Sequence, residues 1–211
     1  MRLARECGLD VPDTDFATLL GRDIYLIRRF DRRIEGNRLR RVPFASSLTM
    51  LEAHEIAAHR YSYRDLAEVL RRLGSNPRPD LRELFRRMAF NILVGNDDDH
   101  LRNHAFVFDG RGWRLSPLYD VVPRPHVGSN GRLILAAGES GHAATLANAL
   151  TGAAAFGLKR EEAAALLEDL RGRVSARWKA ALSEAGIGAI DIERLANCFI
   201  ESGKAEWQRQ A

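Results

Sequence analysis

Lysine, cysteine and long apolar runs are all scarce in this chain of 211 residues. The only lysines are Lys159, Lys179 and Lys204, so none occurs before residue 159. Cys7 and Cys198 lie near opposite ends without a CxxC pair, which argues against a cysteine-built zinc site or a disulfide framework. We therefore expect two free thiols.

The apolar stretches are too short for a membrane protein, because each is interrupted well before the ~18 residues that a membrane span requires. The N-terminal residues 1–8 carry charges where a signal peptide needs an apolar run. Hydrophobic residues nevertheless make up 45% of the chain, enough for a globular core. We expect a folded cytoplasmic protein.

The net charge of +4 is a small excess, because 32 basic residues face 28 acidic ones. With a pI of about 9.4, this balance permits binding to nucleic acid or to an acidic partner but does not require it. We expect many arginines to lie on polar faces towards solvent or a partner, with a surface for DNA or an acidic protein as the alternative. These are Arg38, Arg40, Arg41, Arg71, Arg72, Arg86 and Arg87.

The first 45 residues predict a short helix end followed by two strands. Gly8 would close the helix, and residues 23–30 and 38–42 are rich in strand formers around turn residues 35–37. From residue 46 onward the pattern is mainly helical. We therefore divide the chain into a β-containing part, residues 1–45, and a helical lobe, residues 46–211.

Two helices are predicted by their ends and their apolar spacing. Ser62 and Asp65 match a capping box, and that helix should end near Gly74. Asp80 is expected to cap the next helix, which should end at Gly95. The buried stripe expected on this second helix consists of Leu81, Leu84, Phe85, Met88 and Ile92.

The remaining pattern is a hairpin and then more helix. Runs at 105–108 and 113–115 flank a glycine turn, and a glycine-rich loop follows Pro125. The last third predicts a long helix, a break at Gly186 and Gly188, and a final helix. The stripe expected on the long helix is Ala163, Leu166, Leu167, Leu170, Val174 and Trp178. The predicted fold class is α+β with helices dominant.

The segment from Gly95 to Asn103, GNDDDHLRN, concentrates polar chemistry in what we expect to be an exposed loop. A solvated turn would also explain such residues. However, Asp98 and Asn103 are separated by 103 − 98 = 5 positions, the spacing of the catalytic Asp and the metal-binding Asn in the kinase loop D-x-x-x-x-N. The hairpin could then return Asp120 beside them.

Phosphoryl transfer needs these residue types. A carboxylate positions the attacking hydroxyl, while a second carboxylate and an amide oxygen hold Mg²⁺ on the nucleotide phosphates. Asp98, Asp120 and Asn103 could fill those three roles. A two-metal nuclease using Asp98 and Asp120 is a weaker alternative, because the kinase spacing fits better.

Three segments, taken in order, resemble a known family. They are RFDR at 29–32, FNILVGNDDDHLRN at 90–103 and LSPLYDVV at 115–122. The chain resembles the HipA-like serine/threonine kinases of bacterial toxin–antitoxin systems, over nearly its whole length. The resemblance implies the C-terminal lobe of a protein kinase that transfers the γ-phosphoryl of ATP to a protein Ser or Thr.

The resemblance also implies residue roles. Asp98 would be the catalytic base, and Asn103 and Asp120 would bind Mg²⁺. The nucleotide-binding residues that it implies are Arg28, Arg29 and Phe30 in the hinge beside adenine, His100 and Arg102 near the phosphates, and Asn103, Tyr119 and Asp120.

The chain departs from the family at two places. Arg28 stands where family members commonly have Glu. The family's phosphate-binding loop and nucleotide lysine precede the segment that matches Met1, and no GxGxxG cluster occurs before residue 95. We expect most of the N-lobe to be missing and the chain alone to be a poor kinase, because each charge-stabilising group is worth ~3–4 kcal/mol.

The partners implied by the resemblance are a protein substrate, with an aminoacyl-tRNA synthetase as one candidate, a helix-turn-helix antitoxin and a complementary N-lobe. DNA would be reached only indirectly, through the antitoxin. The alternative is a catalytically weak pseudokinase that binds an antitoxin or another protein. Sequence patterns argue against a zinc site at His100 and His104, a calcium loop and a serine hydrolase.

Overall fold

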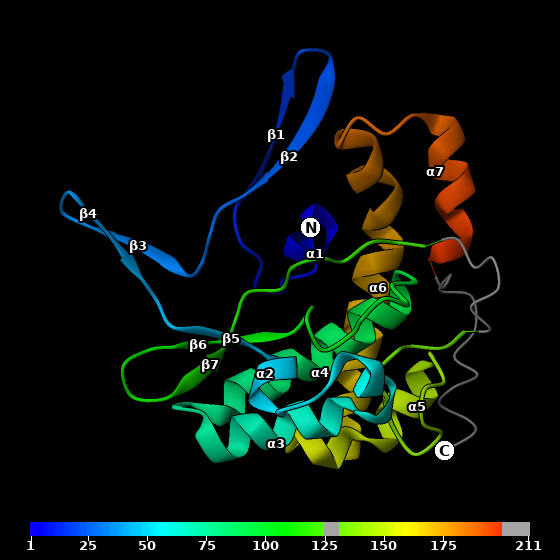
Figure 1. Cartoon of the computed structure of the whole chain (residues 1–211). Coiled ribbons are helices and arrows are strands. Elements are labelled where there is room, and N and C mark those ends of the chain that lie inside the picture. Colours follow the sequence, from blue (N-terminus) through cyan, green and yellow to red (C-terminus); the bar gives the residue numbers. More distant parts are fainter. Residues whose placement is uncertain (125–130, 200–211) are drawn as a thin grey trace.

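The computed structural model describes residues 1–124 and 131–199, which form a helical body with two projecting β-hairpins (Figure 1). The elements in chain order are α1 (Arg2–Glu6), β1 (Thr14–Leu19), β2 (Arg22–Ile27), β3 (Arg32–Glu35), β4 (Arg38–Arg41), β5 (Phe44–Ser46), α2 (Ser47–Met50), η1 (Glu55–Arg60), α3 (Tyr63–Leu73), α4 (Pro77–Leu93), β6 (Ala105–Phe108), β7 (Trp113–Leu115), α5 (Leu146–Thr151), η2 (Ala153–Phe156), α6 (Arg160–Glu184), α7 (Ala189–Leu195) and η3 (Ala196–Cys198). The structure is α+β and mainly helical, as predicted. The predicted glycine-rich loop after Pro125 begins outside the described residues.

The two projecting hairpins replace the single hairpin that the sequence suggested. β1 pairs with β2, and β3 pairs separately with β4, both antiparallel. The first turn is Leu20-Gly21, with φ of 52° and 71°, the geometry of a two-residue hairpin turn. The prediction missed β1 because leucine at such a position gives no turn signal. Every residue from 14 to 41 is partly or fully exposed.

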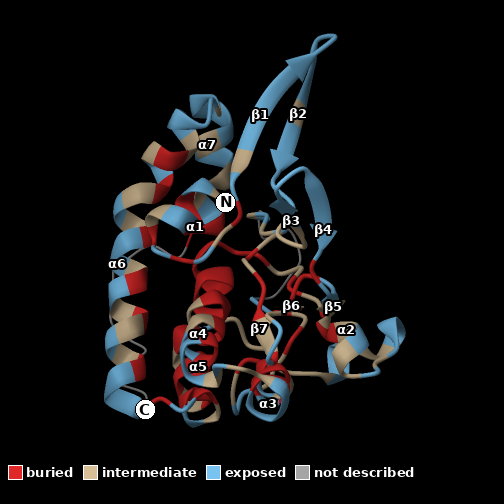
Figure 2. Ribbon diagram, turned by 90° about the vertical axis from the view of Figure 1, so that its left-hand side faces the viewer, coloured by how far each residue is buried: buried red, intermediate tan, exposed pale blue. Residues whose placement is uncertain are grey.

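The body is built around α4, which contacts α3, α5 and α6 and is the most continuously buried helix (Figure 2). Its predicted stripe is confirmed, since all five residues are buried. The stripe predicted on α6 is also buried, except that Leu166 is half-buried. The third sheet, in the order β5-β6-β7, contains the predicted hairpin at 105–115.

The helix start was predicted correctly at α3 and incorrectly at α4, whereas both helices end where predicted, at Gly74 and just before Gly95. Ser62 and Asp65 form the capping box, with Ser62 N donating to Asp65 Oδ2 at 2.7 Å. Helix α4 instead begins at Pro77 after Asn76, with proline in the first turn. Asp80 lies one turn inside the helix and accepts hydrogen bonds from Arg114 Nε at 2.7 Å and Leu115 N at 3.1 Å. It therefore fixes the hairpin to α4.

Arg87 contradicts its expected place on a polar face, because it is only 2% exposed. Its Nη1 donates to the carbonyl of Ser116 at 2.6 Å, and its Nε donates to Glu83 at 3.0 Å. The guanidinium thus ties α4 to the chain just after β7. A buried arginine needs such partners, because an unpaired buried charge is costly.

The cysteines behave as predicted: Cys7 and Cys198 are both buried and free. Trp178 stacks on Phe199 with ring centroids 4.4 Å apart, which agrees with a packing role. Over residues 1–124 and 131–199, the structure contains no helix long and apolar enough to cross a membrane.

Candidate active site

The polar loop lies between α4 and β6 and begins at Gly95. This residue has φ of 63°, and a Cβ placed there would lie 2.7 Å from the carbonyl oxygen of Cys198. Only glycine fits such a close approach. The loop is less exposed than predicted, because Asn96, Asp99 and Asn103 are buried.

A chain of buried amides fixes the start of this loop to the body. Asn96 Nδ2 donates to Asn91 Oδ1 at 3.0 Å, and Asn91 Nδ2 donates to the hydroxyl of Tyr63 at 2.9 Å. The chain thus runs from the loop through α4 to the start of α3. Its only signal in the sequence is the polar Asn91 among the apolar residues of α4, and no motif drew attention to that residue.

Asp99 is fully buried beside the catalytic candidate Asp98. Its Oδ1 accepts a hydrogen bond from Ile134 N at 2.8 Å. Burial raises the pKa of Asp99 to about 7, although the hydroxyl of Tyr63 partly offsets this effect. A buried carboxyl is thereby kept largely protonated up to neutral pH.

His104 is buried at the other end of the loop. Its ring lies edge-on to Tyr63, with centroids 5.2 Å apart. Burial, with a smaller contribution from Arg87, lowers the pKa of His104 to about 3, so the imidazole is neutral. The part of the chain that the structure describes contains no cluster of three His, Cys, Asp or Glu side chains able to hold a metal.

Asp98 and Asn103 are brought together as their spacing predicted. Asn103 Nδ2 donates to the backbone oxygen of Asp98 at 2.9 Å, and Asn103 N donates to the His100 carbonyl at 2.9 Å. The Asp98 carboxylate takes no part in these bonds, and its side chain is 40% exposed. Arg124 holds one nitrogen 3.6 Å from Asp98 and the other 3.6 Å from Asp97. No sequence motif points to Arg124.

The hairpin returns Tyr119 to this loop, and Asp120 follows it in the chain. The hydroxyl of Tyr119 donates to the Arg102 carbonyl at 2.5 Å. Asp120 is exposed and has φ of 56°, a left-handed conformation that is costly for a residue other than glycine. Such strained residues occur preferentially at functional sites.

The two residues expected near the phosphates differ in their surroundings. Arg102 Nη2 donates to Glu55 Oε2 at 2.7 Å, so its guanidinium is directed to η1. The Nδ1 atom of His100 is buried and finds no hydrogen-bond partner among the described residues. The Nδ1 atom of His100 therefore has unused bonding capacity.

The expected hinge residues line a small cavity of about 240 Å³. Phe30 forms its aromatic wall, with its ring centroid 5.7 Å from Tyr119 and 5.8 Å from Phe44. Arg28 pairs with Asp13 at 3.2 Å, and Arg29 makes two hydrogen bonds to Asp31, at 2.8 and 2.7 Å. A larger cavity of about 1080 Å³ adjoins Tyr119 and Asp120 on the side of α1 and β1.

Asn103 in the loop and Asp120 after the hairpin carry the oxygen groups that a hard divalent cation prefers. Asn103 supplies an amide oxygen, and Asp120 supplies an exposed carboxylate. Asp97 Oδ1 is a further buried oxygen that makes no hydrogen bond to the described residues. Mg²⁺ at nucleotide sites needs only one or two carboxylates from the protein, with phosphates and water completing its shell.

Comparison with known proteins decides the family. The model of the HipA-like C-terminal domain matches residues 1–178. The chain belongs to this family. It is 31% identical to Y4mE, a candidate kinase of Sinorhizobium fredii, over 58% of this chain and 30% of that protein. It is 29% identical to the serine/threonine-protein kinase toxin HipA of Shewanella oneidensis, over 58% of this chain and 32% of that one.

Two solved structures share the fold. A chain in the complex of Shewanella oneidensis HipA, HipB and operator DNA superposes with a TM-score of 0.76 and 21% identity, covering 94% of this chain and 51% of that one. The Helicobacter pylori kinase CtkA gives a TM-score of 0.65 and 13% identity, covering 93% and 77%. The chain thus spans about half of the HipA chain and about a third of the curated relatives.

Proposed function

We propose that this chain carries the catalytic loop of an ATP-dependent serine/threonine protein kinase, the toxin of a toxin–antitoxin system. The observation that carries the proposal is the closed loop in which the Asn103 side chain binds the Asp98 backbone while the Asp98 carboxylate stays accessible. This arrangement fits the D-x-x-x-x-N loop of kinases, whose Asp and Asn face the same nucleotide.

In this proposal, Asp98 orients the attacking Ser or Thr hydroxyl and accepts its proton. The hydrogen bond that Nδ2 of Asn103 donates to the Asp98 backbone oxygen leaves Oδ1 of Asn103 as the atom that would ligate Mg²⁺, together with the Asp120 carboxylate. Bound Mg²⁺ would neutralise charge on the ATP phosphates. The left-handed backbone at Asp120 fixes where its carboxylate projects.

The hinge side would bind the rest of the nucleotide. We assign adenine to the aromatic cavity of Phe30 and Tyr119, with Arg28 and Arg29 at its edge. His100, whose buried Nδ1 has no hydrogen-bond partner among the described residues, is assigned to the phosphates. Arg102 would need to exchange Glu55 for a phosphate oxygen, which a guanidinium binds through paired hydrogen bonds.

Completion of the site is part of the proposal. The relatives are longer than this chain, and residues 1–94 contain no lysine or GxGxxG cluster. We propose that a complementary N-lobe supplies the phosphate-binding loop and lysine. A helix-turn-helix antitoxin is the proposed regulator and the indirect link to DNA, and an aminoacyl-tRNA synthetase is the candidate substrate suggested by family resemblance.

Calorimetric titration of Mg-ATP into the purified chain tests the nucleotide site. We expect binding that Asp120→Asn abolishes, because asparagine tolerates the left-handed backbone but lacks the charge. Asp191→Asn, an exposed substitution on α7, is the matched control and should bind as the wild type does. A folded wild-type chain that binds no Mg-ATP would contradict the proposed nucleotide site.

Phosphoryl transfer with a complementary N-lobe supplied in trans tests the reaction. Asp98→Asn should lower the rate by about 10²–10⁴-fold, the usual contribution of general base catalysis, while Mg-ATP binding is retained. If no transfer occurs at saturating N-lobe, and Asp98→Ala leaves capture of the antitoxin unchanged, the chain is a pseudokinase binding module instead.

A further inference from the structure

Positive charge is concentrated in one short segment, residues 28–41. It holds seven arginines against Asp31 and Glu35, a net charge of +5. The whole chain carries only +4, so all other residues together carry −1. The seven are Arg28, Arg29, Arg32, Arg33, Arg38, Arg40 and Arg41.

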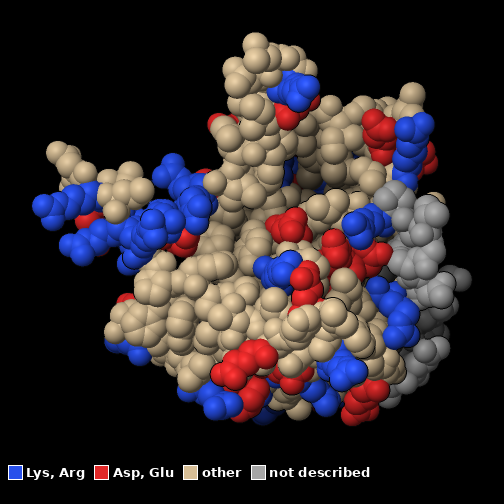
Figure 3. Space-filling view, viewed as in Figure 1, with Lys and Arg blue, Asp and Glu red and all other residues tan. Residues whose placement is uncertain are grey.

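Five of these arginines lie in the arginine ribbon, defined here as strands β3 and β4 with their turn, residues 32–41. It projects from the body (Figure 1), and its basic side chains form a separate blue lobe on the surface (Figure 3). Apart from the half-buried Arg32, all its residues are exposed. A ligand can therefore reach the ribbon from several sides.

The strand register leaves like charges facing one another. Arg32 lies opposite Arg41, and Arg33 lies opposite Arg40, an arrangement that weakens a hairpin when nothing neutralises it. Glu35 pairs with Arg40 at 2.6 Å. Among residues 1–124 and 131–199, no carboxylate lies within ion-pair distance of Arg33, Arg38 or Arg41. Three guanidinium groups of the ribbon thus have no acidic partner among the described residues.

Arginine occurs on both faces of the ribbon. Because opposite residues share a face, Arg33, Arg38 and Arg40 lie on one side, while Arg32 and Arg41 lie on the other. A flat acidic protein surface would neutralise one face only. A groove walled by phosphates would neutralise both.

Shape and chemistry favour duplex DNA as the ligand. The major groove of B-DNA, about 12 Å wide, admits a two-stranded ribbon, whereas the deep, narrow major groove of A-form RNA does not. Arginine forks bind phosphate oxygens and guanine edges through paired hydrogen bonds. We propose that the arginine ribbon binds double-stranded DNA directly, inserted in the major groove. This binding is additional to any DNA association through an antitoxin.

Fluorescence anisotropy with a labelled 20-bp DNA duplex tests the inference on the full chain without any partner. We expect micromolar affinity at low salt, and at least a tenfold weakening in R33Q/R38Q/R41Q. The slope of log K against log salt should fall by about 0.9 for each phosphate that the variant no longer neutralises. The matched control R60Q/R72Q/R111Q removes the same charge from exposed sites on the body and should change affinity less than about twofold.

Three outcomes would overturn the proposal. If both triple variants weaken DNA binding equally, the net charge of the chain explains the binding and the ribbon has no special role. Equal affinity for an RNA duplex of the same sequence would exclude insertion in the major groove. Binding of a polyglutamate peptide without DNA binding would assign the ribbon to an acidic protein. R33K/R38K/R41K guards against misfolding, since it keeps the charge and should retain DNA binding within about tenfold.

Discussion

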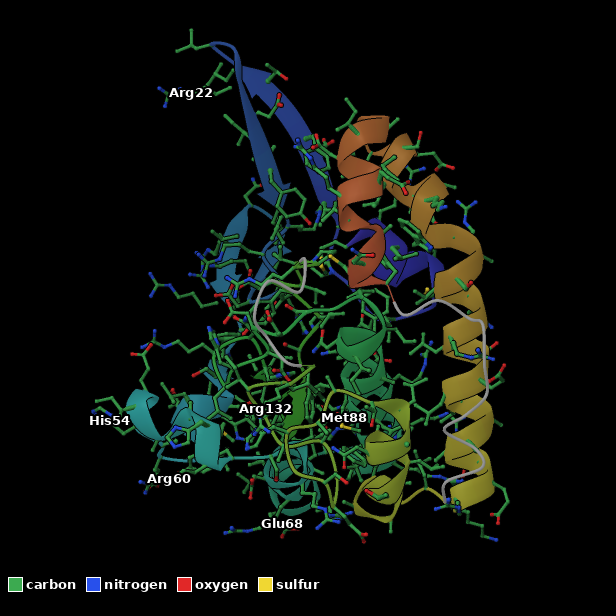
Figure 4. The ribbon with its side chains drawn as sticks, turned by 90° about the vertical axis from the view of Figure 1, so that its right-hand side faces the viewer. Arg22, His54, Arg60, Glu68, Met88 and Arg132 are labelled. Carbon is green, nitrogen blue, oxygen red and sulfur yellow. The ribbon has the colours of Figure 1, made fainter. Side chains whose placement is uncertain are left out.

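The two projecting hairpins and the helical body are stabilised in different ways. Residues 14–41 contain no buried side chain, and they expose Phe16, Leu20 and Ile34, with Leu20 95% exposed. In the body, by contrast, large side chains such as Met88 are enclosed, whereas Arg22 projects from the hairpin into solvent (Figure 4). The hairpins rely mainly on pairing within each hairpin, and isolated two-stranded hairpins are marginal in water. The hairpins therefore lack the buried core that stabilises the body.

Removing the buried guanidinium of Arg87 should cause the largest loss of stability. Arg87→Ala removes a donor from the Ser116 carbonyl and from Glu83, which keeps Arg86 and the Asp10 amide, and breaking a buried pair costs about 3–5 kcal/mol. Urea unfolding followed by circular dichroism measures this. Arg78→Ala, exposed in the same helix, is the control and should stay within about 0.5 kcal/mol. A cost below about 1 kcal/mol for Arg87→Ala would show that the body does not depend on this tie.

The buried pair Asp99 and His104 predicts an unusual pH profile. The folded-state pKa of Asp99 is raised to about 7. Its contribution to the free energy of unfolding is therefore lost as pH rises between about 4 and 7. The folded-state pKa of His104 is lowered to about 3, so its contribution is lost as pH falls below about 6.5. Between about pH 4 and 6.5 the two proton counts cancel, and this pair makes stability nearly independent of pH.

Single substitutions should separate the two contributions. Asp99→Asn leaves His104 alone, so stability should fall by up to about 1.4 kcal/mol per pH unit as pH drops from 6.5 to 4. His104→Gln should give the opposite slope. Urea midpoints at several pH values, compared with the wild type, measure both slopes. Parallel profiles for all three proteins would refute the assignment of protonation states.

The capping box of α3 should contribute a smaller amount. Ser62→Ala removes an acceptor for the Asp65 amide and a partner of its carboxylate, which typically costs about 1 kcal/mol. Ser62→Thr keeps the hydroxyl and is the matched control. Thermal unfolding distinguishes the two. Equal melting temperatures for Ala and Thr would mean that the cap does not stabilise the body.

The smallest effect is expected on the arginine ribbon. Leu39 is 67% exposed, so Leu39→Ala should change the free energy of unfolding by less than about 0.5 kcal/mol. Leu84→Ala, the same change in the fully buried stripe of α4, should cost about 2–5 kcal/mol. If Leu39→Ala costs more than about 1 kcal/mol, the ribbon packs against something, and the contrast between hairpin and body fails.

Sequence patterns predicted those structural features that depend only on residues close together in the chain. The Ser62 cap, the apolar stripe of α4 and the positive φ at Gly95 all follow from local spacing or from glycine's conformational freedom. The closeness of Asp98 and Asn103 is equally local, since one loop contains both.

Positions fixed by distant partners were not predictable in this way. Asp80 resembles a helix cap until Arg114, from another element, binds its carboxylate. Asp99 looks like one more acidic residue in an exposed run, yet Ile134 binds it in the interior. The sequence shows that Asp80 and Asp99 are acidic but not which distant residues they contact. Their burial depends on those contacts.

Tyr119 joins two parts of the molecule that the chain separates by many residues. Its ring rests on Phe30 at the base of the arginine ribbon, and its hydroxyl holds the backbone of the loop that carries Asp98 and Asn103. Bending at residues 28–31 would press directly on this one aromatic side chain. A ligand that reorients the hairpins would therefore shift the positions of Asp98 and Asn103 through Tyr119.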